Sequence, residues 1–192
     1  MQKDVSKQSN FSEVCKECNF FYCCQNARPP ITRKRKKIIE SYLAAQGLRI
    51  EKLFDNTTYT FLRETNDGFC ILFDKEAGKC LVHSVKPETC VAGPITFDIN
   101  LQTGKIEWFL KTENICPLAG TLYKDKEALE KHSSSAKKEL QTLVHELDAE
   151  ALCTILQIEE PETFKIGEDA LSPEILEKIT KHERKLSILN MV

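Results

Sequence analysis

The 192-residue sequence has no long apolar run and little glycine or proline. No stretch approaches the ~20 consecutive apolar residues that a membrane-spanning helix needs. Residues 1–14 are polar and lack the apolar centre of a secretory signal. Seven glycines and seven prolines are too few for a fibrous or low-complexity chain, and a hydrophobic fraction of 41% can form a sizeable core. We therefore expect a globular, cytoplasmic protein that makes no membrane contact.

The sequence also lacks common catalytic motifs and a strong net charge. It contains no Gly-rich phosphate loop, no G-x-S-x-G and no H-E-x-x-H. A net charge of −2 provides no whole-molecule attraction for nucleic acid. Residues 1–120 carry 17 Lys and Arg against 14 Asp and Glu, whereas residues 121–192 carry 10 against 15. This asymmetry indicates two regions of different character and leaves open whether the protein is an enzyme.

The sequence is instead rich in cysteine, with nine in total. The candidate metal ligands are the eight in the first 116 residues: Cys15, Cys18, Cys23, Cys24, Cys70, Cys80, Cys90 and Cys116. In a reducing cytosol, clustered thiols more often bind metal or do redox chemistry than form structural disulfides. The ninth, Cys153, lies at helical spacing among apolar residues, and we expect it in the core.

The pattern of residues predicts an α+β fold. A helix follows Thr32, a good N-cap, and ends at Gly47. Short antiparallel strands are then predicted at 58–63, 69–74, 80–83, 95–99 and 106–110. Residues 122–158 contain no Gly or Pro and have helical spacing, with a polar break at 132–135 that divides two helices. A last helix begins at Ser172-Pro173 and runs to about Leu189.

This pattern divides the chain into two predicted parts. Residues 12–118 form a small cysteine-rich module held together by bound metal, because loops with few apolar residues do not order themselves alone. Residues 119–192 form a helical C-terminal segment packed on it.

The spacing of the cysteines suits a thiolate metal site. Cys15 and Cys18 form a C-x2-C pair, which lets one turn of loop direct two sulfurs at one ion. Cys23 and Cys24 are adjacent, so their side chains diverge; one as a ligand, or one on each of two metals, is easier to build than both on one ion. A hairpin would bring Cys70 near Cys80. Cys116 precedes Pro117, and a Cys-Pro step occurs at iron–sulfur ligands.

The same cysteines carry a resemblance to a known family. The matching motifs, in order, are Cys15-x2-Cys18-x4-Cys23-Cys24, Gly68-Phe69-Cys70-Ile71-Leu72, Gly78-Lys79-Cys80 and Lys86-Pro87-Glu88-Thr89-Cys90. Over residues 12–118 the sequence resembles the zinc- or iron-chelating CxxCxxCC family, also called YkgJ-like cysteine cluster proteins. The sequence departs from the family pattern at Lys86, where arginine is usual, and in a longer gap before the vicinal pair. The resemblance implies a metal or iron–sulfur site and does not specify a reaction.

The cysteines allow three interpretations: buried small hydrophobes, a thiol–disulfide exchange system, and metal ligands. Eight cysteines in 116 residues with C-x2-C and CC spacing favour metal. The cofactor is then an iron–sulfur cluster, of the 4Fe-4S type, or zinc; thiolate ligation suits either, and the Cys-Pro step favours the cluster. One main site is the simpler arrangement, although eight thiols could form two.

Histidines and a basic run are secondary candidates. His83 could replace a thiolate, although a surface position is more usual, and His132, His145 and His182 are expected to be exposed. The run Arg33–Lys37 places positive charge in the first turn of a helix, where it opposes the macrodipole, and an anionic partner would offset that cost. A solvated basic face is the simpler interpretation.

These observations support three hypotheses of function. The first is a metal- or iron–sulfur-binding protein with a redox, accessory or sensing role, whose helical C-terminal segment contacts a protein partner. The second is an enzyme in which the cluster supports modification of a protein substrate. The third is a zinc-stabilised module that binds nucleic acid through the basic helix.

Overall fold

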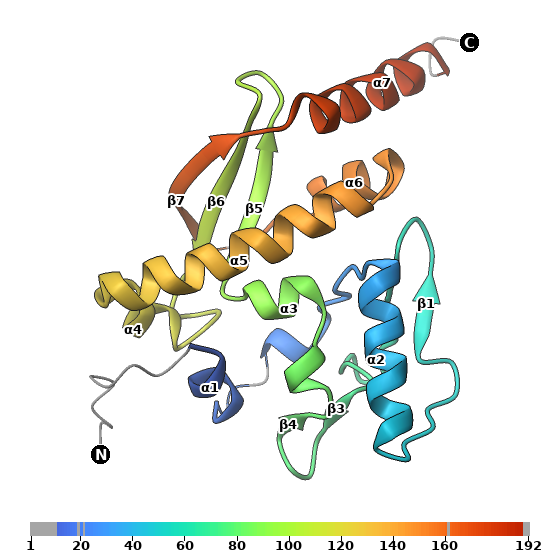
Figure 1. Ribbon diagram of the computed structural model, residues 1–192, viewed down its shortest axis with the longest axis vertical. Helices are drawn as coiled ribbons and strands as arrows, with labels where there is room; N and C mark the ends of the chain where they lie inside the picture. The colour runs from blue at the N-terminus through green and yellow to red at the C-terminus, as the bar shows by residue number, and fades with distance from the viewer. Residues whose placement is uncertain (1–10, 19, 21, 161, 190–192) are drawn as a thin grey trace.

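A computed structural model describes residues 11–18, 20, 22–160 and 162–189, and part of the polar N-terminal stretch therefore lies outside it. The fold is α+β, as predicted, with helices and small antiparallel sheets (Figure 1). The helices are α1 (Phe11–Lys16), α2 (Arg33–Ala45), α3 (Glu88–Ala92), α4 (Ala119–Lys124), α5 (Lys126–Glu146), α6 (Ala149–Leu156) and α7 (Pro173–Leu189). The strands are β1 (Phe54–Asn56), β2 (Thr60–Leu62), β3 (Phe73–Asp74), β4 (Lys79–Cys80), β5 (Ile95–Asn100), β6 (Lys105–Lys111) and β7 (Thr163–Ala170). No described helix is long and apolar enough to cross a membrane.

The largest sheet has the order β5-β6-β7, with all neighbours antiparallel. The β5–β6 hairpin confirms the strands expected at 95–99 and 106–110. Burial alternates along both strands, so one face of the sheet is apolar and packs against α5. Trp108 is fully buried on this face, and its indole N–H donates to Asp169 of β7 at 2.6 Å.

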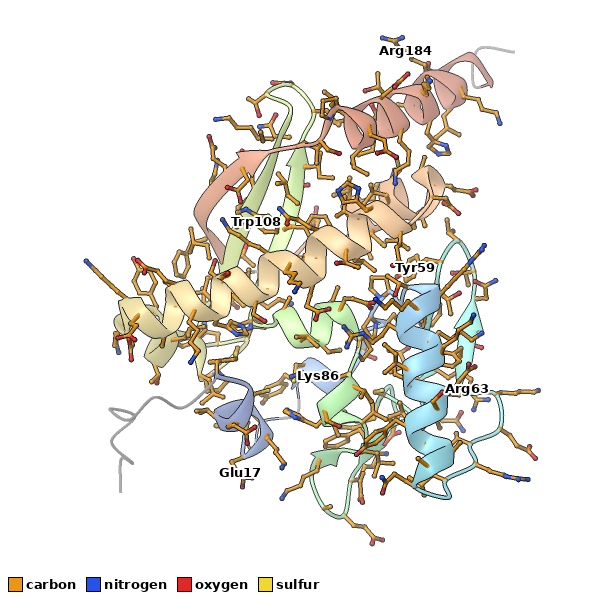
Figure 2. The ribbon with its side chains drawn as sticks, viewed as in Figure 1. Glu17, Tyr59, Arg63, Lys86, Trp108 and Arg184 are labelled. Atoms are coloured by element: carbon orange, nitrogen blue, oxygen red, sulfur yellow. The ribbon has the colours of Figure 1, made fainter. Side chains whose placement is uncertain are left out.

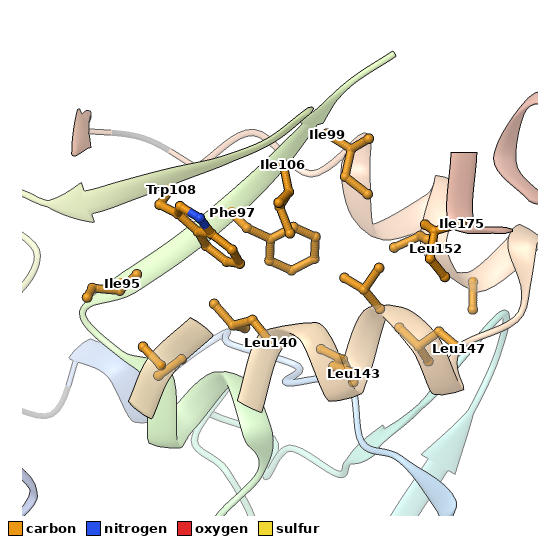
Figure 3. Close-up of a cluster of buried hydrophobic side chains, with 14 of the residues drawn as sticks. Ile95, Phe97, Ile99, Ile106, Trp108, Leu140, Leu143, Leu147, Leu152 and Ile175 are labelled. Atoms are coloured by element: carbon orange, nitrogen blue, oxygen red, sulfur yellow. The ribbon is translucent and has the colours of Figure 1, made fainter. Parts of the chain in front are cut away.

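This packing creates the main hydrophobic core, which we name the sheet core (Figure 3). Leu140 and Leu143 of α5 lie opposite Phe97, Ile106 and Trp108. The far end is closed by buried residues of α6 and α7: Ala151, Leu152, Ile175 and Ile179. Each fully buried Leu or Ile side chain contributes ~2 kcal/mol, which makes this core the principal source of stability.

The helix break predicted at 132–135 is wrong, because α5 continues through it from Lys126 to Glu146. Serine is only a moderate helix breaker, and the apolar stripe of Ala136, Leu140 and Leu143 gains more from packing than the serines cost. The Asp125 side chain caps the helix by accepting from the N–H of Ala128. The chain breaks later, at Leu147 and Asp148, before α6.

Strand β7 was not predicted, so the C-terminal segment is not wholly helical. Its sequence, TFKIGEDA, has a weak alternation because it is an edge strand with much of its surface exposed. Its pairing with β6 is a long-range contact that local pattern does not encode. The predicted boundary at residue 118 therefore lies between segments that share one sheet and one core.

A second, smaller core lies under α2, and we name it the small core. It contains seven buried residues: Ile31, Ile39, Leu43, Leu53, Leu62, Leu72 and Val82. The Thr32 side chain caps α2 by accepting from the N–H of Arg35, and Gly47 follows the helix with φ +70°, as the sequence predicts. The strands beside this core, β1 to β4, have only two or three residues each.

Candidate metal centre

The eight candidate cysteines come from separate segments of the chain. Cys15 lies on α1, Cys23 and Cys24 in a short 3-10 turn, Cys80 at the end of β4 and Cys90 on α3. Cys18, Cys70 and Cys116 lie in connecting loops. All nine cysteines of the chain are free thiols in the structure, so their sulfurs are chemically able to bind metal.

Backbone hydrogen bonds bring three of these segments together. The carbonyl of Cys24 accepts from the N–H of Cys70 at 2.8 Å, although 46 positions separate them in sequence. The carbonyl of Cys70 accepts from the N–H of Phe73 at 2.8 Å, and Phe73 pairs with Cys80 across the β3–β4 hairpin. The hairpin confirms the predicted approach of Cys70 and Cys80, with strands shorter than expected.

Several sulfurs accept hydrogen bonds from the backbone shortly after them. The donor N–H groups belong to Phe20 for Cys18, Leu72 for Cys70, Val82 for Cys80, and Leu118 and Ala119 for Cys116. A hydrogen bond from N–H to sulfur stabilises the thiolate, which is the form that binds metal. These N–H groups therefore favour the thiolate form, although burial has the larger effect on Cys70, Cys80 and Cys116.

The thiol pKa values show that the eight sulfurs share one neighbourhood. Burial raises the pKa of the Cys70 thiol to about 11 and also raises the pKa of Cys15, Cys80, Cys90 and Cys116. In each case a neighbouring cysteine raises the pKa further, because two thiolates repel one another. The Cys23 thiolate raises the pKa of four of these thiols, namely Cys15, Cys80, Cys90 and Cys116.

The vicinal pair behaves as a thiolate and a thiol. A hydrogen bond from the Cys24 side chain lowers the pKa of Cys23 to about 6, and the same bond raises the pKa of Cys24. Cys23 is the exposed member of the pair and Cys24 is partly buried. The two residues therefore offer different sulfurs, one anionic near neutral pH and one protonated.

The donor set fits zinc or iron chemically, since both bind thiolates. Within the described residues, no three His, Cys, Asp or Glu side chains are disposed around one point so as to hold an ion. The backbone and the hydrogen bonds to sulfur therefore bring the segments together, while the side chains must still rotate toward a common centre for metal to bind.

Comparison with known proteins agrees with this arrangement. The model of the CxxCxxCC family, described as "Putative zinc- or iron-chelating domain", matches residues 14–117 and so includes all eight cysteines. The chain belongs to the CxxCxxCC family. A curated relative, the Uncharacterized protein MJ0661 of Methanocaldococcus jannaschii, is 28% identical over 104 residues, which are 50% of this chain and 54% of the relative. The chain thus spans about half the length of that relative. No solved structure matches.

The CxxCxxCC domain ends where α4 begins, and a pocket lies on that boundary. The pocket has a volume of about 430 Å³ and is lined by Lys111, Thr112, Glu113, Asn114, Ala119, Gly120, Tyr123 and Phe164. Tyr123 and Phe164 contact each other edge to face, with ring centroids 5.1 Å apart. Its lining residues flank Cys116 on both sides in sequence, although no cysteine lines the pocket.

The histidines differ from their predicted exposure in one clear case. His132 is buried, which corrects the prediction; its Nε2 lies 3.0 Å from the carbonyl oxygen of Ala92, and its ring lies against Phe11. The His132 side chain lies on the buried face of α5. The charged residues beside it in sequence gave no sign of this position. His145 is exposed, as expected, and His182 is half-buried. His83 is also half-buried, and its shielded Nε2 has no hydrogen-bond partner among the described residues.

The two remaining candidates are Cys153 and the basic run Arg33–Lys37. Cys153 is partly buried against the sheet core, as predicted, and burial raises its pKa. In the basic run, Arg35 turns inward to bind Glu139 at 2.5 Å, and Lys36 lies over the Phe54 ring at 4.9 Å. Arg33, Lys34 and Lys37 remain exposed.

Proposed function

We propose that the eight cysteines bind zinc or an iron–sulfur cluster through thiolates. The observation that carries this proposal is the convergence of thiols from distant segments around Cys23, with backbone N–H groups directed at their sulfurs. The match to a zinc- or iron-chelating family supports it. Bound zinc would cross-link these segments, whereas an iron–sulfur cluster would also supply one-electron transfer.

Within this proposal the protein's own groups have distinct tasks. The N–H groups after Cys70, Cys80 and Cys116 lower the pKa of those thiols against the larger effect of burial, and so favour the thiolates that metal binding would produce. The vicinal pair supplies one thiolate at Cys23, while Cys24 would lose its proton on binding metal. A reducing compartment, the cytoplasm, would keep these thiols free of disulfides.

The role we propose is redox, accessory or sensing, with the helices of the C-terminal segment as the surface for a protein partner. A metal centre between α1, α3 and the β3–β4 hairpin would link the N-terminal segments to the sheet core. Gain or loss of metal would then change the order of the N-terminal segments beside that surface, as a sensor or accessory protein requires.

A second candidate is an enzyme in which the centre supports modification of a protein substrate. The pocket whose lining residues flank Cys116 in sequence favours it, because such a pocket could hold a substrate group. Tyr123 and Phe164 would offer apolar contact, and Asn114 and Glu113 would offer polar contact. Replacing Tyr123 with Ala would then lower turnover without changing metal content.

The experiment that tests the proposal is metal and sulfide analysis, with a visible spectrum, on protein purified without oxygen. Brown protein with iron and acid-labile sulfide establishes a cluster; colourless protein with about one or two zinc ions per chain establishes a zinc site. Cys80→Ser should reduce the metal content, whereas Cys153→Ser, the matched control outside the centre, should not. Equal metal content in both variants, or none in the wild type, contradicts the proposal.

A further inference from the structure

One lysine is buried beside the thiols. Lys86 is 7% exposed, and it is the buried lysine of the described chain. Its Nζ lies 3.6 Å from Sγ of Cys15, on a segment 71 positions away. Figure 2 labels Lys86 in the lower half of the molecule, close to α1 and α3. Lysine is rarely buried unless its charge is paired, so this position needs a counter-anion.

No carboxylate serves as that anion. Within the described residues, no Asp or Glu lies within 4.0 Å of the Lys86 ammonium, the limit for an ion pair. Glu88, two residues further on, is directed elsewhere: its Oε1 accepts from the Thr32 hydroxyl at 2.6 Å and lies 3.6 Å from Arg35. The anions available to Lys86 are therefore the thiolates.

The Lys86 backbone is anchored by Arg35 of α2. The carbonyl of Lys86 accepts from the Arg35 guanidinium at 3.0 Å, and that guanidinium also binds Glu139 of α5 at 2.5 Å. Arg35 thus connects α2, the segment Lys86–Glu88 and α5. This hydrogen bond anchors the Lys86 backbone, and the buried side chain brings its ammonium to Cys15.

The charge reaches several thiols at once. Besides Cys15, the Lys86 ammonium lowers the pKa of Cys23, Cys80 and Cys90, each from a different segment, although burial acts in the opposite direction on Cys15, Cys80 and Cys90. A thiolate centre concentrates negative charge, since four thiolates around a divalent ion leave an excess of two. A fixed cation at this place favours such a centre.

We propose that Lys86 is the positioning residue and counter-cation of the metal centre, holding Cys15 through its sulfur and balancing the charge of the assembled thiolates. This inference rests on the proposed function. It goes beyond the ligand set, because it assigns a determinant of metal affinity to a residue that does not bind the metal.

The test compares Lys86→Met, Lys86→Arg and, as a matched control, Lys79→Met, which removes an exposed lysine directly beside Cys80. Each protein is loaded with Zn²⁺ under reducing conditions and titrated with a competing chelator. Lys86→Met should lose metal about 10- to 100-fold more readily. Lys86→Arg should stay near the wild type, and Lys79→Met should equal it.

A second measurement separates this role from simple packing. In the metal-free proteins, Lys86→Met should melt no lower than the wild type, because methionine removes a buried ammonium and preserves most of the volume. Should the wild type assemble a cluster, Lys86→Met should lower its reduction potential, since removal of positive charge favours the oxidised form.

The outcomes are distinct. Wild-type affinity in Lys86→Met overturns the inference and leaves the proposed function intact. Loss of metal together with an equally large loss of metal-free stability also overturns it, because Lys86 would then be structural. A wild type that takes up neither zinc nor iron refutes the proposed function itself.

Discussion

The two cores of this protein are stabilised in different ways. The sheet core buries twenty residues, enough to fold by hydrophobic burial; eighteen come from β5, β6 and helices α3 to α7 with their flanking segments, and Tyr59 and Phe61 come from the β2 segment. The small core, which lies within residues 11–85, buries seven, and the strands of this region have two or three residues each. The candidate thiols lie mostly in this second region, and Cys90 and Cys116 lie on segments joined to the sheet core. A bound metal would therefore tie a weakly packed region to a strongly packed one.

Removal of metal should have the largest effect, and it tests directly whether the two cores differ in their need for metal. Chelation should accelerate amide hydrogen exchange across residues 11–85, since a structural metal supplies on the order of 10 kcal/mol that this region cannot replace. Strands β5 and β6 and helix α5 should keep their protection, because the sheet core needs no metal.

Hydrogen exchange read by mass spectrometry checks this expectation peptide by peptide. Unchanged exchange in residues 11–85 after complete removal of metal would show that the small core suffices alone. Equal loss in β5 and β6 would show that the two cores unfold together.

A matched pair of glycine substitutions sharpens the comparison within the thiol region. Gly68 has φ +81°, and a Cβ there would lie 2.4 Å from Oδ1 of Asn26, whose N–H donates to the Gly68 carbonyl. Gly47 has φ +70° and open space around it. Gly68→Ala should therefore cost about 1–3 kcal/mol and weaken metal retention, because the Gly68–Asn26 contact aligns the segments of Cys24 and Cys70.

Gly47→Ala should cost about 1 kcal/mol and leave metal retention unchanged. Denaturant unfolding and chelator competition measure both quantities. Equal effects of the two substitutions on metal retention would mean that the contact between Gly68 and Asn26 does not organise the site.

The smallest predicted effect is a pH dependence at the junction of α3 and α5. Burial lowers the pKa of His132, although its hydrogen bonds to the Ala92 and Gly93 carbonyls oppose the change. The unfolded chain takes up the proton first, at about pH 6.5, so the stability contributed by neutral His132 is complete above that pH. It is lost as the pH falls from there through the lower native pKa, by on the order of 1 kcal/mol.

His132→Gln keeps a hydrogen-bond donor and cannot titrate. Unfolding of the metal-free proteins at pH 7.5 and pH 5 should show a smaller decrease in the variant than in the wild type. Exposed His145 supplies the control, and His145→Gln should retain the wild-type decrease. An identical decrease in all three proteins would remove His132 as its cause.

The elements that the sequence predicted well are those with a local signal. Thr32 and Gly47 mark the ends of α2, and alternating burial marks β5 and β6. The cysteine spacing indicated which eight residues gather, and the structure brings their segments together. Strand β7, the continuous α5 and buried His132 were missed, because each depends on a partner distant in sequence: β6, the sheet face and the Ala92 carbonyl respectively.

By itself, then, the sequence predicted the chemistry of the site, since thiols in this order favour metal whatever their detailed arrangement, and the family match supports metal binding. It also determined the family and the mixed fold class. Only the tertiary structure decided that the segments of Cys24, Cys70 and Cys80 meet, that Lys86 is a buried cation beside Cys15, and that the Lys86 carbonyl accepts from Arg35. These are long-range contacts, and their free energy depends on which segments meet rather than on which residues are neighbours in sequence.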